Sequence, residues 1–353
     1  MRFSLIYLLL VLALQSVASL AADVAHDPYH IGVLYWSMNI QGQVVMRKGL
    51  EAEAERINAA AQQQGSRGVK LTIKIAGNGD EGVERQIRQM LAMIESGPDV
   101  IIVQPTDNAA LAAPLRKANE AGIPVVAYDQ YISGGHLTAY VTSDNRQAGY
   151  LDGEYLAARF SGPKPLRLVL VEYPLVSSTV ERVNGFLDAL RDQNKRINIL
   201  KTYQAVEPIS GRKAGEAILH DFPKRNSIDA VFTVNDGGGL AVVDALAQAG
   251  RDEIAIATID GDPRSVENIL ARRLTIIDSA QFCGPLGATA MKAAYAVAQH
   301  QPVAQQILVP TFPITVETFD HYPGWMGPIP PSFKKPWTSK QPVWRGDTLP
   351  TKK

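Results

Sequence analysis

The sequence predicts an α/β protein with two similar lobes, each built on a parallel sheet flanked by helices. Two observations support this. Short β-branched strands alternate with helical segments along most of the chain, and a break at Pro163 and Pro165 divides the alternation into two series of the same plan. Alternating strands and helices build a parallel, doubly wound sheet. The 353 residues are enough for two domains with separate cores.

The stretch from residue 99 to residue 130 shows the repeating unit most clearly. The apolar run VIIV predicts a strand buried on both faces, PTDN ends it and caps a helix, and the Gly and Pro of GIP end that helix. A second strand, VVAY, leads to Asp129 and Gln130. Ligands of open α/β sheets lie beyond the carboxyl ends of the strands, so we expect Asp107, Asp129 and Gln130 along one rim.

The other elements follow from the same signals. Apolar residues that recur every three or four positions predict helices, and short β-branched or alternating runs predict strands. Before residue 163 we expect strands at 30–36, 69–76 and 140–145 and helices at 42–61, 83–94 and 147–160; after it we expect strands at 166–171, 197–203, 230–234, 254–259 and 274–281, helices at 177–190, 211–220, 240–249 and 285–299, and an extended return at 303–312.

Residues 1–22 have the pattern of a secretory signal peptide. Arg2 supplies the positive charge, residues 5–14 form an apolar core, and the tripeptide SLA at 19–21 forms a small-residue cleavage site. A membrane anchor is the alternative, but the apolar run is shorter than the ~20 residues that a spanning helix needs. We therefore predict that the mature chain is exported to the periplasm.

Charge and cysteine content narrow the function further. The formal net charge of zero argues against a nucleic-acid-binding surface. Cys283 is the single cysteine, so no intrachain disulfide can form. This thiol could act as a nucleophile, but no His is close in sequence and a buried structural thiol is the commoner case.

Several stretches together resemble one protein family. These are PTDNAALAAPLRKANEAGIPVVAYDQ, TSDNRQAGYLDGEYLA, ERVNGF, FTVND, IDGDPRSVENI and SAQF. In this order and spacing the chain resembles the periplasmic sugar-binding proteins related to the ribose-binding protein, over about residues 30–316. The resemblance implies the type I periplasmic binding protein fold: two Rossmann-like lobes joined by three crossings, hinged so that they close on a ligand in the cleft.

This fold implies a division of the chain. We expect an N-terminal lobe at 28–140 plus 282–310 and a C-terminal lobe at 141–281 plus 311–321. Residues 322–353 form a tail that is rich in Pro and contains three of the four Trp. It shows no helical or strand period, so we expect either that its aromatic residues pack onto one lobe or that it docks a partner.

The resemblance also implies the ligand-binding residues. It places Asp129 and Gln130 in the cleft, although the family usually has Asp-Arg there, so Gln130 removes a cation. Arg182 of ERVNGF matches the arginine that reaches the sugar. Planar groups of these types can bind neighbouring hydroxyls in pairs. Three further polar contacts are implied: Asn235, Asp260 and Gln281.

Each of these residues also has an ordinary structural alternative. Asp129 and Asp260 could cap a turn, Asn235 could cap a helix, and Arg182 could lie on a helix surface. Asp144 is expected to cap the helix that follows it.

The aromatic platform of the cleft departs from the family pattern. The family offers rings after the first strand, where this chain has Gly42 and Gln43. Tyr35 and Trp36, slightly upstream, could supply the platform instead. The alternative is that one of them is core and the other exposed. The ligand could therefore be a sugar, a polyol or a polar molecule that is not a sugar.

Four classes of function remain to be weighed. The first is a binding protein that delivers a sugar to an ABC importer, and the second is a periplasmic sensor that signals to a chemoreceptor or histidine kinase. A transcription regulator would need a DNA-binding helix-turn-helix where the signal peptide stands. An enzyme would need a nucleophile with its base, or a metal cluster, and neither is visible. We predict a monomeric binding protein without cofactor, metal or nucleic-acid partner.

Overall fold

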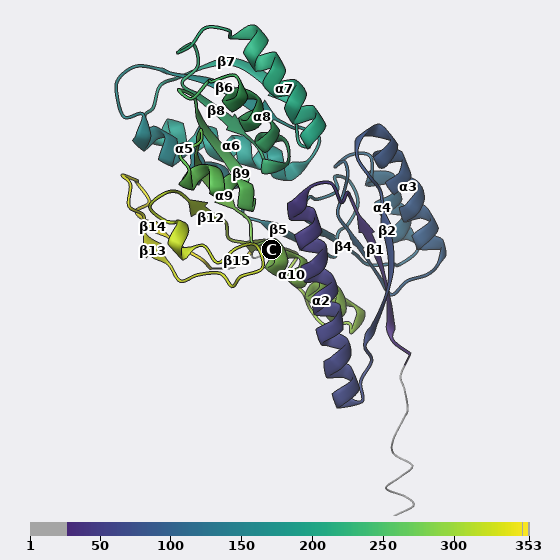
Figure 1. Ribbon diagram of the computed structural model, residues 1–353. Coiled ribbons are helices and arrows are strands. Elements are labelled where there is room, and N and C mark those ends of the chain that lie inside the picture. The colour runs from purple at the N-terminus through teal and green to yellow at the C-terminus, as the bar shows by residue number, and fades with distance from the viewer. Residues whose placement is uncertain (1–26, 348, 352–353) are drawn as a thin grey trace, which may run out of the picture.

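The computed structural model describes residues 27–347 and 349–351 of the chain. It shows two large sheets with helices packed on both faces of each (Figure 1), which confirms the predicted fold class. The predicted signal peptide, residues 1–22, lies outside the described residues. Within them, no helix is both long and apolar enough to span a bilayer.

The first sheet has the strand order β15-β11-β5-β4-β3-β1-β2. Its strands are parallel except for β15, which pairs antiparallel with β11. Strands β3 and β4 are buried along their whole length, as expected for apolar strands covered on both faces. The strands are Tyr29–Tyr35 (β1), Val69–Ile75 (β2), Val100–Val103 (β3), Val125–Tyr128 (β4), Ala139–Ser143 (β5), Gln306–Val309 (β11) and Leu349–Thr351 (β15), and the helices of this lobe are Gln41–Gln64 (α2), Gly79–Glu95 (α3), Ala112–Glu120 (α4) and Cys283–Ala298 (α10).

The second sheet has the order β12-β10-β9-β8-β6-β7. It is parallel except for β12, which pairs antiparallel with β10. Its strands are Leu166–Glu172 (β6), Ile197–Gln204 (β7), Ala230–Thr233 (β8), Ala255–Asp260 (β9), Thr275–Ala280 (β10) and Phe312–Ile314 (β12), and its helices are Asn145–Arg159 (α5), Ser177–Asp192 (α6), Pro208–Asp221 (α7), Asp236–Gln248 (α8) and Pro263–Leu270 (α9).

The chain passes between the two sheets after β5, after β10 and after β11, and the tail returns from β12 in the second sheet to β15 in the first. The first boundary that we predicted, between residues 140 and 141, is wrong because it falls inside β5. That strand pairs with β4 and β11 over its length and belongs wholly to the first sheet. The predicted boundary near residue 281 falls in the short connection between β10 and α10, and the one near residue 310 falls between β11 and β12.

Helices α5 and α6 approach each other through glycines. A Cβ at Gly149 would overlap the backbone oxygen of Arg182, and one at Gly185 would overlap that of Arg146. Glycine alone lacks a Cβ, so the two helices can pack this closely only with glycine at these positions. The contact sets the position of the α6 backbone at Arg182, which we predicted to face the cleft.

The tail packs on both lobes (Figure 1), which differs from the first of our two expectations, that its aromatic residues pack onto one lobe. Strand β15 extends the first sheet, whereas Lys335 and Trp337 donate hydrogen bonds to Glu154 of α5 in the second lobe. Trp344 is buried, and its Nε1 donates to the Thr311 backbone oxygen at 2.7 Å. The tail also contains the antiparallel pair Phe333–Lys334 (β13) and Val343–Trp344 (β14), and the short helix Phe319–His321 (η1) precedes it. Strands of two or three residues are too short to show a period.

A buried ion pair anchors the tail to α5. Lys335 Nζ lies 2.8 Å from Glu154 Oε1, and the two side chains are 2% and 0% exposed. Burial is the main cause that lowers the pKa of Lys335, and its hydrogen bond to Glu154 opposes this effect. Breaking a buried pair from one side leaves an uncompensated charge, which costs about 3–5 kcal/mol.

We therefore expect Lys335→Met to lower the free energy of unfolding by about 3 kcal/mol, measured by urea denaturation. The matched control is Lys334→Met, one residue earlier on an exposed side chain, which should change stability by less than about 0.5 kcal/mol. Equal effects of the two substitutions would contradict the anchoring role.

Candidate functional site

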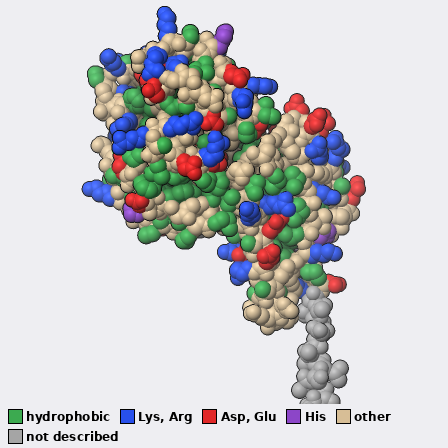
Figure 2. Space-filling view, in the orientation of Figure 1, with side chains coloured by type: hydrophobic (Ala, Val, Ile, Leu, Met, Phe, Trp, Pro, Cys, Tyr) green, Lys and Arg blue, Asp and Glu red, His purple; other side chains and the backbone are tan. Residues whose placement is uncertain are grey.

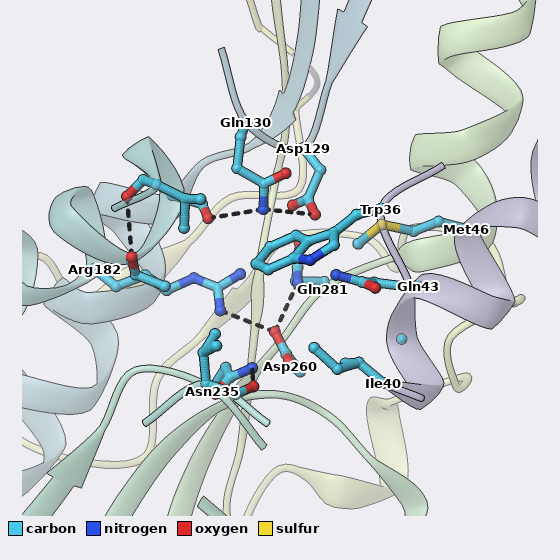
Figure 3. Close-up of a pocket in the computed structure, with 15 residues that line it drawn as sticks. Trp36, Ile40, Gln43, Met46, Asp129, Gln130, Arg182, Asn235, Asp260 and Gln281 are labelled. Atoms are coloured by element: carbon cyan, nitrogen blue, oxygen red, sulfur yellow. Dashed lines mark hydrogen bonds and ion pairs between the residues drawn. The ribbon is translucent and has the colours of Figure 1, made fainter. Parts of the chain in front are cut away.

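Seven of the eight predicted ligand-binding residues line one pocket between the lobes (Figure 3). Six of them end or follow parallel strands of the two sheets, whose carboxyl ends face this pocket, and the seventh comes from α6. None is more than 5% exposed, so the lobes are closed around the pocket. The seven residues are Trp36, Asp129, Gln130, Arg182, Asn235, Asp260 and Gln281.

Tyr35 does not line the pocket, and its predicted role as a platform is wrong. Successive side chains of a strand point to opposite faces, so Tyr35 and Trp36 cannot face the same space. Tyr35 is fully buried in the core of the first lobe, where its hydroxyl donates to Glu51 at 3.4 Å. Trp36 is the ring that faces the pocket, with Met46 beside it (Figure 3).

Two other residues have structural roles. Asp107, expected on the rim, accepts from the backbone N–H groups of Ala109 and Ala110 and does not line the pocket. Asn235 lines the pocket but also caps α8, because its Oδ1 accepts from Gly238 and its Nδ2 donates to Val206.

Arg182 is the centre of the polar network. Its Nη1 donates to Asp260 Oδ1 at 3.0 Å and to the Val234 backbone oxygen at 2.8 Å, and its Nε donates to Asn145 Oδ1 at 2.9 Å. Gln281 Nε2 donates to the same Asp260 oxygen at 2.7 Å. Arg182 is only 3% exposed, which excludes a place on the helix surface.

Asp129 sits opposite, in the first lobe. Its Oδ2 accepts hydrogen bonds from Gln104 Nε2 and Gln130 Nε2, both at 2.9 Å. Gln130 Nε2 also reaches across the cleft to Ser178 Oγ at 3.3 Å, so one amide connects the two lobes. Burial is the main cause that raises the pKa of Asp129, and the nearby charge of Arg182 opposes it most.

Both cleft aspartates adopt a backbone conformation that residues other than glycine rarely take. The φ angle is 66° at Asp129 and 138° at Asp260. Such positions store strain and cluster where a structure holds a side chain for function. At Asp260 the backbone oxygen also accepts from Trp325 Nε1 of the tail at 2.6 Å.

Buried carboxyl groups lie behind Asp260. Burial, then the charges of Asp278 and Asp260, raise the pKa of Asp236. Burial is also the main cause that raises the pKa of Asp278 to about 8. Asp278 Oδ2 accepts no hydrogen bond from the described residues, and the hydrogen bond that the two carboxyls share raises the pKa of Asp236 and lowers that of Asp278, so Asp236 is the donor of the pair. We infer that Asp278 holds a proton at neutral pH.

Sequence reasoning missed the pocket residues that lie in or near the first turns of helices. Ser178 and Thr179 precede Arg182 by four and three positions, so they share its face of α6, and this spacing could have identified them. Gln43 and Met46 line the pocket from the beginning of α2. The added lining residues are Ile40, Gly42, Gln43, Met46, Val176, Ser178, Thr179 and Val206. Across residues 27–347, no group of His, Cys, Asp and Glu is arranged to hold a metal ion.

A model of the periplasmic binding protein domain matches residues 31–302. The chain belongs to this family. The match covers most of both lobes and ends before the tail. It confirms the resemblance drawn from the sequence motifs.

Sequence relatives of this periplasmic binding protein include two ribose import binding proteins. That of Bacillus subtilis (strain 168) is 28% identical over 265 residues, which are 74% of this chain and 80% of the relative. That of Escherichia coli (strain K12) is 25% identical over 255 residues, or 71% of this chain and 79% of the relative.

Solved structures share the fold. An ABC transporter solute-binding protein from Bacillus halodurans with bound myo-inositol has a TM-score of 0.72 at 22% identity, over 85% of this chain and 99% of that chain. One from Actinobacillus succinogenes with bound D-allose has a TM-score of 0.70 at 23% identity, over 83% and 100%. At these identities the likeness establishes the fold.

The raised pKa of Asp278 predicts a pH-dependent stability. The folded protein keeps a proton that the unfolded chain releases above pH 3.8, and it loses this proton near pH 8. This contribution to stability is therefore complete below the lower value and is lost as the pH rises through the upper one. In Asp278→Asn, urea denaturation from acidic to alkaline pH should show a smaller decline than in the unchanged protein.

The control for this experiment is Asp252→Asn, whose side chain is 81% exposed. Its hydrogen bond with Arg225 lowers the pKa of Asp252 below 3.8, so this substitution should leave the slope of stability against pH unchanged above about pH 5. Parallel curves for Asp278→Asn and the unchanged protein would show that Asp278 is not protonated in the fold.

Proposed function

We propose that this protein is a periplasmic solute-binding protein that captures a small polyhydroxylated ligand, most directly a sugar, and delivers it to an ABC importer. The observation that carries this proposal is the set of planar polar side chains that converge from both lobes on one closed pocket. Membership of the periplasmic binding protein family supports the location and the role.

The chemistry of the pocket suits hydroxyl groups. Each sugar hydroxyl both donates and accepts, and carboxylate, amide and guanidinium groups can bind two neighbouring hydroxyls at once. Asp129, Arg182 and Gln281 supply one of each kind. The ring of Trp36 offers a flat apolar surface against which the C–H face of a sugar can pack.

The contacts between the lobes support a mechanism of closure. Asn108 of the first lobe accepts from the Ser177 backbone, and the Tyr131 backbone donates to Ser177 Oγ at 3.1 Å. With Gln130 and Ser178, these bonds form only when the lobes meet. A ligand that bridges Asp129 and Arg182 would favour this closed state, which a permease can distinguish from the open one.

Delivery is favoured over sensing because the two sequence relatives described above are named as import proteins. On the face shown in Figure 2, acidic and basic side chains are interspersed around the furrow where the lobes meet. A permease could dock on such a surface through both lobes, and the position of the lobes would then report whether the cleft is loaded.

A thermal-shift screen over sugars and polyols tests the proposal. A ligand that binds only the folded state raises the melting temperature. At a free ligand concentration of 100 times its Kd, it raises the free energy of unfolding by about 2.7 kcal/mol. We expect at least one monosaccharide or polyol to do so. An Arg182→Ala, Asp260→Ala double variant should lose the shift, and Asp252→Asn should retain it. If no sugar or polyol shifts the melting temperature, the proposed function is wrong.

A further inference from the structure

The pocket contains more buried negative charge than positive charge. Its lining has two carboxylates, Asp129 and Asp260, and one cation, Arg182. The cation pairs with Asp260 at 3.0 Å, and both side chains are less than 8% exposed. One carboxylate of the three charged groups therefore remains without a partner of opposite charge.

That carboxylate is Asp129. Its hydrogen-bond donors, Gln104 and Gln130, are uncharged amides. No Lys, Arg or His among the described residues lies within ion-pair distance of it, although the charge of Arg182 is felt nearby. A buried charge without a counter-ion is costly, so the closed cleft is incomplete until something positive enters it.

The layer behind the cleft supplies no counter-ion for Asp129, because its carboxyl groups, whose pKa values are raised by burial, add no positive charge. Asp236 and Asp278 lie next to Asp260 and interact with it electrostatically. With both of these carboxyls protonated, the pocket still holds two carboxylates, Asp129 and Asp260, against one cation, Arg182. A second cation would be favoured here, and a second anion would be repelled.

The polar oxygens near Asp129 can accept hydrogen bonds from a ligand. Oε1 of Gln43 and Oε1 of Gln130 are buried and accept no hydrogen bond from any residue that the structure describes. A protonated amine donates three hydrogen bonds and accepts none, so it satisfies carboxylate and amide oxygens together. The Trp36 ring in the same pocket attracts a cation through its face.

The rest of the pocket still requires hydroxyls. The hydrogen bonds described for Arg182 use its Nε and Nη1, so the guanidinium has donor capacity for a ligand hydroxyl. A simple alkylamine or a quaternary ammonium compound would leave this capacity unused, because neither offers hydroxyl groups. One amine on a polyhydroxylated ring meets both demands.

We propose that the cleft selects an amino sugar, with its ammonium group at Asp129 and its hydroxyls at Arg182, Asp260 and Gln281. This inference rests on the proposed function and narrows the class of sugar. In this arrangement, side chains of the second lobe bind the hydroxyl groups of the ligand, and Asp129 of the first lobe binds its positive charge.

Isothermal titration with matched ligands tests the inference. D-glucosamine and D-galactosamine should bind at least about tenfold more tightly than D-glucose and D-galactose at a pH where the amines are protonated. The N-acetylated sugars, which keep the skeleton and lose the charge, should bind as weakly as the neutral hexoses or more weakly.

Two substitutions locate the preference. Asp129→Asn removes the charge with little change of shape and should reduce the amine preference to less than about twofold. Gln130→Arg supplies the missing cation and should reverse the preference toward neutral hexoses, which keeps the test decisive if the Asn variant does not fold. Asp252→Asn removes one surface charge and should preserve the preference.

Neutral hexoses that bind as tightly as the amines, or an amine preference that survives Asp129→Asn, would overturn this inference and leave the proposed function standing. If neither neutral nor amino sugars nor polyols bind, the proposed function fails and the inference falls with it.

Discussion

One buried guanidinium, that of Arg182 on α6, connects the elements on the second-lobe side of the cleft. It bonds to α5 through Asn145, to the end of β8 through the backbone of Val234, and to β9 through Asp260. A cation buried to this extent is tolerated only with its partners in place. The glycine contacts between α5 and α6 and the unusual backbone at Asp260 both serve to bring those partners within hydrogen-bond distance.

The two lobes contribute unequal chemistry to the same space. In the second lobe, Arg182 balances Asp260, so that side of the pocket is nearly neutral and offers many hydrogen bonds. In the first lobe, Asp129 is held by amides alone. When the lobes close, Asp129 is buried together with Arg182 and Asp260. Burial by both lobes makes the excess of negative charge significant. In an open cleft, water would screen it.

The tail lies beyond the residues that the family model matches, which end at residue 302. It adds a strand to the first sheet, forms a buried ion pair with α5, and places Trp325 against the backbone of Asp260. These contacts lie on both lobes and on the edge of the site. The tail is therefore an integral part of the closed form, and any movement of the lobes must be accommodated by it.

The sequence by itself determined the alternation of strands and helices, and with it the polar residues at strand ends. Asp129 and Gln130 could be predicted because the end of a parallel strand is a local feature, and Arg182, Asp260 and Gln281 because their motifs resemble those of a family.

Where the local sequence allowed a residue to face either the core or the cleft, only the tertiary structure decided between the two. Alternation along β1 places Tyr35 and Trp36 on opposite faces, but which face is core depends on the helices packed there. The same holds for Gln43 and Ser178 in their helices, for the whole of β5 in the first sheet, and for Lys335, whose partner Glu154 is 181 residues away. Contacts between segments so distant leave no period in the sequence, because they arise only when the lobes have folded and met.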